Sequence, residues 1–427
     1  MKKIIAISLS FVLFIARSFA GAADFFDHRI FEIKINAPVN ISNNTVAVTD
    51  FLKKEVIIDL KDIYNDMPKK GFNMTADIMP SIDITLDFKK GLHFGIEAGV
   101  DLYSKMGLSK DLFKFIAMGN ELGEEIKIGI DGYADAFAFG GIDIGFNLKK
   151  FNIRVQPTVF ASLVHVATND AFVKVGNKDD EYTYNILING NMDVYSAIPM
   201  TNELIKDSGT MISQMMSQLG PSMGFDLSGQ MSFKPFDILT VTGSVRIPMV
   251  PSHLSWKTSA NYTQEWDISL DKIIGKKENT EEGESESSTT EESGPSMDQI
   301  FSDPVEAKYY IHRPMKIAVS ADFKPFSWLM SYYGTLGIGI KHPFAQNRAE
   351  TYAYIDYLIG TKLSLVNIIS LYLSTERTDE IYKHKATLAL NFRLVEVDAG
   401  VAFESSNLKT SFKGAGVGAF VTACVGF

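Results

Sequence analysis

The chain has 427 residues, of which 46% are hydrophobic, and a formal net charge of -10 at pH 7. The negative charge and the lack of any dense cluster of Lys and Arg exclude a nucleic-acid-binding protein, which needs a basic patch. The single cysteine, Cys424, excludes a disulfide framework. No stretch beyond the N-terminal region approaches the roughly 20 consecutive apolar residues that a membrane helix needs.

The N-terminus carries an export signal. Lys2 and Lys3 precede an apolar run over residues 4–15, and the small residues of Ser18-Phe19-Ala20 follow it. This order of a basic, an apolar and a small-residue region predicts a secretory signal peptide over residues 1–20. An exported chain of this size without cysteine pairs is typical of a bacterial envelope.

Residues 24–71 form a less regular N-terminal segment. One strand is expected near residues 30–35, and later residues mix the β-branched run Val56-Ile57-Ile58 with the helical spacing of Leu60, Ile63 and Tyr64. We expect this segment to act as a hatch or plug that packs inside a barrel or across an opening.

Residues 72–102 carry the clearest pattern in the chain. Apolar side chains occupy every second position from Phe72 to Phe88, and the alternation restarts after the turn Lys89-Lys90-Gly91. A period of two is typical of β-strands, and a glycine-containing turn between two such runs predicts a hairpin. The polar face is rich in carboxylates and the apolar face is uninterrupted. One face should therefore meet water and the other lipid or a protein core.

Similar alternation continues to the C-terminus with few breaks. It is strong over residues 126–159, resumes over 223–270 and runs again over 307–427, whereas 110–118 predicts a helix or loop and 202–219 a helix of about four turns. The count is about 14–16 antiparallel strands, more than an open sheet usually carries without closing or splitting.

An acidic segment at residues 276–296 interrupts the strands. It places seven glutamates among Ser, Thr and Gly. Such a segment cannot bury enough apolar surface to offset its ordering entropy, so we expect a disordered loop within the barrel.

The last strand decides between a soluble sandwich and a membrane barrel. Phe427 ends a row in which Val425, Ala423, Val421 and residues further back share one face. This resembles the C-terminal targeting strand of bacterial outer-membrane β-barrels, and it implies recognition by the barrel-assembly machinery. Together with the export signal and the many amphipathic strands, it predicts an all-β transmembrane antiparallel β-barrel over residues 72–427. The location would be the outer membrane of a diderm bacterium, with outer-membrane lipid around the wall; a large soluble periplasmic β-protein is the alternative.

Strand parity assigns the connections if both barrel termini lie in the periplasm. Residues 405–409, 375–381, 341–349 and 271–306 then fall outside the cell. By the same count, residues 324–327 and 249–252 fall on the periplasmic side, and the helix over 202–219 is periplasmic or plug-like.

The inward faces of the early strands are acidic. They predict an interior biased against anions, although the same side chains would also solvate a plugged barrel. The candidate lumen-facing residues are Asp77, Asp83, Asp87, Glu97, Asp101, Asp131 and Asp135.

A barrel of this strand number has room for a lumen, so passage of a small molecule across the outer membrane is the leading hypothesis. The barrel is either a porin-like channel or a route for hydrophobic compounds. The plan of about 14 strands after a folded segment resembles the long-chain fatty-acid transporter (FadL-like) family, in which the N-terminal segment forms a hatch. Asn36-Ala37-Pro38 is similar to that family's Asn-Pro-Ala triplet but departs from its order, so no ligand residue is assigned. The alternative is a structural or adhesive surface protein without transport activity.

Catalysis is not expected. The seven histidines are scattered, and none lies in a Gly-x-Ser-x-Gly or His-Glu-x-x-His motif. The sequence predicts no enzyme, no cofactor and no metal site.

Overall fold

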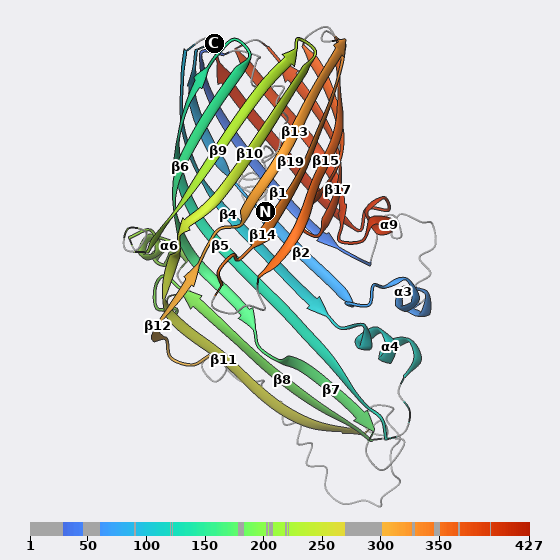
Figure 1. The fold of residues 1–427 in the computed structure, drawn as a ribbon. Helices are drawn as coiled ribbons and strands as arrows, with labels where there is room; N and C mark the ends of the chain where they lie inside the picture. The colour runs from blue at the N-terminus through green and yellow to red at the C-terminus, as the bar shows by residue number, and fades with distance from the viewer. Residues whose placement is uncertain are drawn as a thin grey trace, which may run out of the picture.

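The strands of the chain close into a barrel. The computed structural model describes residues 29–45, 60–88, 91–119, 121, 123–177, 183–201, 204, 208–217, 220, 222–269, 301–326, 329–345, 351–365, 368–392 and 394–427. Nineteen labelled strands belong to one sheet. The sheet closes because β1 (Phe31–Asn43) pairs antiparallel with β19 (Gly416–Gly426) (Figure 1). The predicted antiparallel β-barrel is confirmed.

The elements follow one another along the chain with few helices between them. The other strands are β2 (Phe72–Ile78), β3 (Ser81–Asp87), β4 (Gly91–Leu108), β5 (Glu125–Asn147), β6 (Phe151–Thr168), β7 (Ala171–Asn177), β8 (Thr183–Ser196), β9 (Met223–Phe236), β10 (Leu239–Val250), β11 (Ser252–Ser269), β12 (Val305–Ile311), β13 (Met315–Phe326), β14 (Met330–Lys341), β15 (Tyr352–Leu365), β16 (Ile369–Thr378), β17 (Ile381–Asn391) and β18 (Val395–Ser405). The described helices are α3 (Leu60–Asp66), α4 (Lys110–Met118), α6 (Ser208–Ser217) and α9 (Leu408–Ser411).

Several wall strands are interrupted and carry two labels. Strand β5 pairs on one side with β6 and, further along, with β7; β1 and β4 each pair with both β2 and β3. In the same way β8 runs on into β9, β10 into β11, and β12 into β13. With each interrupted strand counted once, the nineteen labels make a barrel of fourteen strands. This number lies within the predicted range.

The two ends of the barrel differ in their connections. One end carries the C-terminus and short turns, and the other carries α3, α4, α9 and a sheet extension built from β7, β8, β11 and β12 (Figure 1). The predicted outer connections 405–409, 375–381 and 341–349 leave strands at this second end, opposite the turn after β13. We call it the long-loop end.

Two of the connection assignments are wrong. Residues 249–252 do not turn the chain, because β10 and β11 run in the same direction as the two halves of one wall strand. Helix α6 likewise lies in the interruption between β8 and β9, beside the barrel and away from the end with the short turns (Figure 1). Parity counting failed here because an interruption was counted as a reversal.

The N-terminal segment 24–71 is not a hatch where the structure describes its first half. Phe31–Asn43 is a wall strand that bonds β19 on one side and β2 and β3 on the other. The barrel therefore begins at Phe31 and not at Phe72. Helix α3 lies at the long-loop end, outside the wall (Figure 1). The predicted signal peptide and the acidic segment 276–296 lie outside the described residues.

The wall separates an apolar outer face from a polar inner face. On β3 the outward Ile82, Ile84 and Leu86 are each at least 38% exposed. The alternate residues are less exposed, as the period of two requires. No helix among the described residues is both long and apolar enough to cross a membrane.

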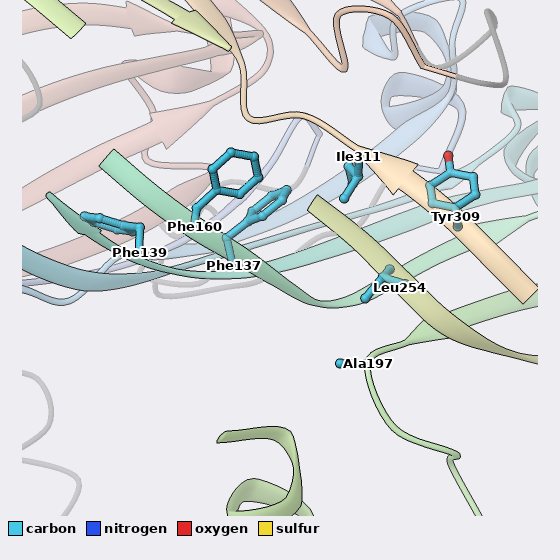
Figure 2. Close-up of a cluster of buried hydrophobic side chains, with 7 residues drawn as sticks. All are labelled: Phe137, Phe139, Phe160, Ala197, Leu254, Tyr309 and Ile311. Atoms are coloured by element: carbon cyan, nitrogen blue, oxygen red, sulfur yellow. The ribbon is translucent and has the colours of Figure 1, made fainter. Parts of the chain in front are cut away.

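Two buried apolar clusters lie on or beside the wall. The first joins Phe137, Phe139 and Phe160 to residues of β11 and β12, among them Leu254 and Tyr309 (Figure 2). In the second, Leu112 and Phe115 of α4 pack on Ile126 and Ile128 of β5 and on Val175 of β7. The segment 110–118, expected as a helix or loop, is this helix.

Candidate functional site

The barrel encloses a polar cavity that we call the lumen cavity. Its volume is about 270 Å³, and it is lined by residues from β1 and β2 round to β19, with the rings of Tyr103, Tyr333 and Tyr354 among charged side chains. Most of the charges are paired across the interior. Lys383 lies 3.6 Å from Asp77, and Lys385 lies 2.7 Å from Glu376.

The seven carboxylates expected in the lumen separate into three groups. Asp77, Asp101 and Asp135 line the lumen cavity. Asp83, Asp87 and Glu97 are held near the wall: Asn36 Nδ2 donates to Asp83 at 2.9 Å, Arg154 lies 3.2 Å from Asp87, and Gln156 donates to Glu97. Asp131 is solvent-exposed. Three of the seven therefore gather in one place.

The lumen cavity is not acidic. Its lining includes seven Lys and Arg side chains against six Asp and Glu side chains. The basic residues lie mainly on strands after β9, whereas the acidic pattern was taken from the early strands. The lining of this cavity therefore gives no excess of negative charge in support of an interior biased against anions, which stays a prediction.

The wall contains a break between β2 and β3. Register is continuous across it, since Ile78 faces Leu102 and Ser81 faces Gly99 on β4. Met79 and Pro80 lie between the two halves, beside Ala37 and Pro38 of β1. Proline has no backbone N–H to donate, so Pro38 and Pro80 each remove one possible ladder hydrogen bond here, although the Val100 N–H still donates to the Pro80 carbonyl oxygen at 2.9 Å.

An apolar cavity, here named the wall cavity, opens on the outer face at this break. Its volume is about 660 Å³, within the range of small-molecule sites. Small residues on neighbouring strands hollow the wall there, and Ser81 supplies the only polar side chain in the lining. The lining residues are Ala37, Pro38, Ile78, Pro80, Ser81, Ile82, Ala98, Gly99, Val100, Ala138, Phe139, Gly140, Val159, Phe160, Ala161 and Met223.

One layer of side chains separates the two cavities. Pro38 lines both of them. Phe139 and Phe160 line the wall cavity, and the guanidinium of Arg313, which lines the lumen cavity, lies 4.4 Å and 6.0 Å from their ring centres. Phe139 of β5 and Phe160 of β6 are partners in the strand register, and in Figure 2 the Phe160 ring lies beside that of Phe137. Arg313 is buried and lies 3.3 Å from Asp226, so its charge is compensated.

Pro80 is a sequence signal for the break between β2 and β3. Pro80 was counted as one more apolar residue of a continuous strand, although proline inside a strand marks an edge, a bulge or an interruption. A second proline, Pro38, lies in the first strand. Nothing local indicated that the two would be neighbours, because β1 and β2 are separated by the α3 connection.

The part of the chain that the structure describes shows no metal-binding cluster. There, no group of three or more His, Cys, Asp or Glu side chains is arranged to hold a metal ion. Asp135, His165 and His342 form a buried cluster in which His165 Nδ1 lies 2.7 Å and His342 Nε2 lies 3.0 Å from the Asp135 carboxylate.

Comparison with known proteins gives similarity in structure only. No protein-family model matches the sequence, and no curated protein does. Among solved structures, the P. putida toluene transporter TodX is similar with a TM-score of 0.43 and 7% identity, over 93% of this chain and 89% of that one. The monoaromatic hydrocarbon channel CymD gives 0.39 and 7%, over 96% and 94%. A Pseudomonas aeruginosa FadL homologue gives 0.37 and 10%, over 95% and 92%.

One of these solved structures, the Pseudomonas aeruginosa FadL homologue, bears the name of the family that the sequence resembles. With TM-scores below 0.5 and identities of 10% or less, they do not indicate the solute of this barrel.

Proposed function

We propose that this protein is an outer-membrane barrel through which small hydrophobic molecules pass, leaving the lumen sideways through the wall cavity. The observation that carries the proposal is the position of that cavity. It is apolar, opens on the lipid-facing surface, and shares Pro38 with the lumen cavity.

The outer surface supports a membrane location. Large apolar side chains are exposed around the wall, for example Phe94 on β4, Ile144 on β5, Ile153 on β6, Leu336 on β14 and Ile359 on β15. A continuous apolar band around a closed sheet suits hydrocarbon, where every backbone group must be satisfied internally. The C-terminal strand ending at Phe427 remains our predicted signal for assembly into the outer membrane.

The lining of the route changes from polar in the lumen cavity to apolar in the wall cavity. A solute in the lumen cavity meets paired charges and tyrosine rings, and at Pro38 it meets the layer of Phe139 and Phe160. Beyond that layer the lining is almost wholly hydrocarbon. An apolar molecule loses contact with water along this route, and its transfer into lipid is favourable by about 25 cal/mol for each Å² of apolar surface removed from water. A polar solute gains nothing by leaving the lumen.

Filling the wall cavity should block the route. Gly140 lines it on β5, and a Cβ built there meets only a backbone oxygen at 3.7 Å, an ordinary contact. We expect Gly140→Phe to place a ring in the cavity and to lower transfer of an apolar dye, N-phenylnaphthylamine, to the rate of protein-free vesicles. The measurement is the rise of dye fluorescence in proteoliposomes.

The matched control is Gly243→Phe on β10. Gly243 also has open space for a side chain, with no atom within 4 Å of its Cβ position, but it does not line the wall cavity. Dye transfer should remain at the unsubstituted rate in this variant. If the unsubstituted protein moves no dye, the barrel is not a route for hydrophobic molecules, and the structural or adhesive alternative replaces the proposal.

A further inference from the structure

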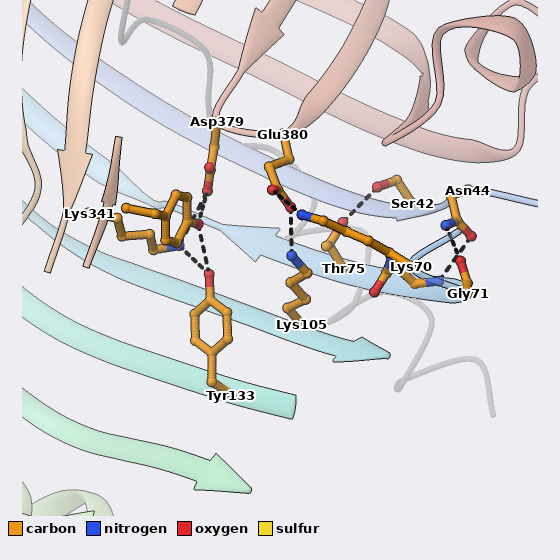
Figure 3. Close-up of polar contacts among 12 residues, drawn as sticks. Ser42, Asn44, Lys70, Gly71, Thr75, Lys105, Tyr133, Lys341, Asp379 and Glu380 are labelled. Atoms are coloured by element: carbon orange, nitrogen blue, oxygen red, sulfur yellow. Dashed lines mark hydrogen bonds and ion pairs between the residues drawn. The ribbon is translucent and has the colours of Figure 1, made fainter. Parts of the chain in front are cut away.

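Two turns at the long-loop end reach across the barrel to the opposite wall. The first is the described start of the connection after β14, residues 341–345, and the second joins β16 to β17 at Asp379-Glu380. Figure 3 shows Lys341, Asp379 and Glu380. We call these two turns the crossing turns. Their contacts are with β4, β5 and the α3 connection, none of which neighbours them in the sheet.

The second crossing turn is held by an ion pair. Glu380 Oε2 accepts a hydrogen bond from Lys105 Nζ of β4 at 2.6 Å, and its other oxygen lies 3.4 Å from Lys70 Nζ. Between β17 and β4 the wall contains β18, β19, β1 and the β2/β3 strand. The contact therefore spans the opening and does not belong to the ladder of the wall.

The first crossing turn is held by two contacts with β5. Lys341 Nζ donates to the Tyr133 hydroxyl at 2.7 Å, and His342 Nε2 lies 3.0 Å from Asp135 Oδ2. The other oxygen of Asp135 lies 2.7 Å from His165 Nδ1 on β6. Strands β6, β9, β10 and β13 separate β5 from β14 around the wall.

The two crossing turns are also joined to each other. Asp379 Oδ2 lies 3.4 Å from Lys341 Nζ and accepts a hydrogen bond from the Tyr352 hydroxyl at 2.9 Å. The backbone N–H of Asp379 donates to Asp356 Oδ1 at 2.7 Å. Lys341, His342 and Asp379 are each less than 9% exposed. Buried polar contacts therefore couple the two crossing turns to each other.

The crossing turns are strained. Four non-glycine residues in the described chain have a positive φ, and His342, Phe344 and Asp379 are three of them. Such a conformation costs of order 1–3 kcal/mol for each residue and persists only where surrounding contacts enforce it. The closed wall does not need these turns, because its ladder already satisfies the backbone. Strain held by contacts across an opening is the arrangement expected of a latch.

We propose that the crossing turns form a latch over the entrance of the barrel, closed by the contacts of Glu380 with Lys105 and of Lys341 and His342 with β5. Releasing these contacts relaxes the strained turns and opens the lumen at the long-loop end. The inference rests on the proposed passage, since a latch has a function only where a solute enters.

Breaking either contact should open the barrel. Glu380→Ala removes the pair with Lys105, and Tyr133→Phe removes the hydroxyl that holds Lys341 while keeping the ring. We expect each variant to raise the open fraction in planar bilayers in potassium chloride about fivefold, and the double variant to raise it further. Lys174→Ala is the control, since its pair with Glu125 at 2.8 Å joins neighbouring strands β5 and β7. It should leave the open fraction unchanged.

A reversible cross-link tests the latch in the other direction. Lys105→Cys with Glu380→Cys places two thiols where the native side chains touch, in a background in which buried Cys424 is changed to Ala. A short bifunctional methanethiosulfonate should close the channel, and dithiothreitol should restore it. Each single-cysteine variant should be insensitive to the reagent. The shift in gel migration on boiling checks that every variant has folded.

Equal open fractions in all variants, with no effect of the cross-linker, would overturn the latch. Dye transfer in the same vesicles separates this outcome from failure of the proposed function. If dye moves at the same rate with and without the cross-link, the passage exists and the latch does not. If dye moves in no variant while ion conductance responds to the cross-link, the latch exists and the hydrophobic route does not.

Discussion

Gly99 has no side chain, and this leaves room for the Phe139 ring at the break between β2 and β3. A Cβ on Gly99 would lie 2.5 Å from the carbonyl oxygen of Pro80 and 2.7 Å from Cζ of Phe139. Both distances are shorter than real Cβ atoms tolerate. Glycine at position 99 therefore lets the Phe139 ring cover the gap from the inner side, where Arg313 packs on it. One residue without a side chain thus sets the thickness of the layer between the lumen cavity and the wall cavity.

Glu380 should give the latch a defined response to acid. Burial raises the pKa of its carboxyl, but the hydrogen bond and charge of Lys105, with the charge of Lys70, outweigh burial and hold the pKa below its ordinary value of 4.5. A carboxylate with a lowered pKa in the folded state contributes fully above its ordinary pKa and loses its contribution as the pH falls through the lowered value. The difference in open fraction between the unsubstituted protein and Glu380→Ala should therefore stay constant from neutral pH to about 5 and disappear in stronger acid.

This comparison isolates Glu380 from the other titratable groups at the entrance. Asp135, His165 and His342, which face the first crossing turn, are present in both proteins, so only Glu380 differs between the two. Planar-bilayer recordings over a pH series measure the difference in open fraction between the unsubstituted protein and Glu380→Ala. A difference that vanishes between neutral pH and about 5 would show that the contact of Glu380 with Lys105 does not hold the latch.

At the scale of strands, alternation predicted most of the wall because each strand has water on one face and apolar surroundings on the other. Residues 72–102 are the clearest case, and Ile84 and Phe94 point outward as their period requires. The first strand was missed as wall although Phe31, Ile33 and Ile35 continue the same alternation through Val39 and Ile41. The expected strand near residues 30–35 is too short because Pro38 and the asparagines at positions 36, 40 and 43 disfavour strand, and pairing with β19 overrides that local preference.

The candidate site was predictable only in part. Asp77, Asp101 and Asp135 were found by their inward register, but their partners lie far along the chain: Lys383 for Asp77, and His342 for Asp135. A period of two indicates the face of the wall on which a residue lies and not which residues stand opposite it across the barrel. Charge balance in the lumen depends on those distant strands, so the acidic residues of the early strands alone do not determine it.

The break between β2 and β3 should close when its prolines are replaced. Pro38→Val with Pro80→Val restores two backbone N–H donors where the ladder is missing and supplies residues that favour strands. We expect dye transfer to fall toward that of Gly140→Phe, and the free energy of unfolding to rise by about 1 kcal/mol for each hydrogen bond formed. Dye transfer and urea unfolding measure the two effects.

Pro157→Val is the matched control for the proline pair. Pro157 lies within wall strand β6 opposite Leu227 and does not line the wall cavity. Its replacement should leave dye transfer unchanged. Unchanged transfer in the Pro38→Val, Pro80→Val protein, with the strands shown to be paired by amide hydrogen exchange, would mean that the solute does not leave through the break.

For the whole molecule, closure depends on the pairing of the two ends of the chain. Ten residue pairs join β1 to β19, and the carbonyl oxygen of Phe427 accepts hydrogen bonds from the N–H groups of Ile30 and Phe31. A barrel without this seam exposes two strand edges to hydrocarbon, where each unsatisfied backbone group costs several kcal/mol. The N-terminal strand is therefore as necessary to closure as the C-terminal one.

Deleting residues 31–43 distinguishes a wall strand from a hatch. A hatch can be removed from a closed barrel without opening its sheet, but removal of β1 leaves one edge of β19 and one edge of the β2/β3 strand unpaired. We expect the deletion to abolish the folded form, which migrates differently on a gel before and after boiling. The chain should also be missing from the outer-membrane fraction. Deletion of residues 276–296, which lie between β11 and β12 in sequence, is the control and should keep that form. A heat-modifiable barrel that survives loss of residues 31–43 would mean that β19 closes directly on β2 and β3, and that the first strand is dispensable to the wall.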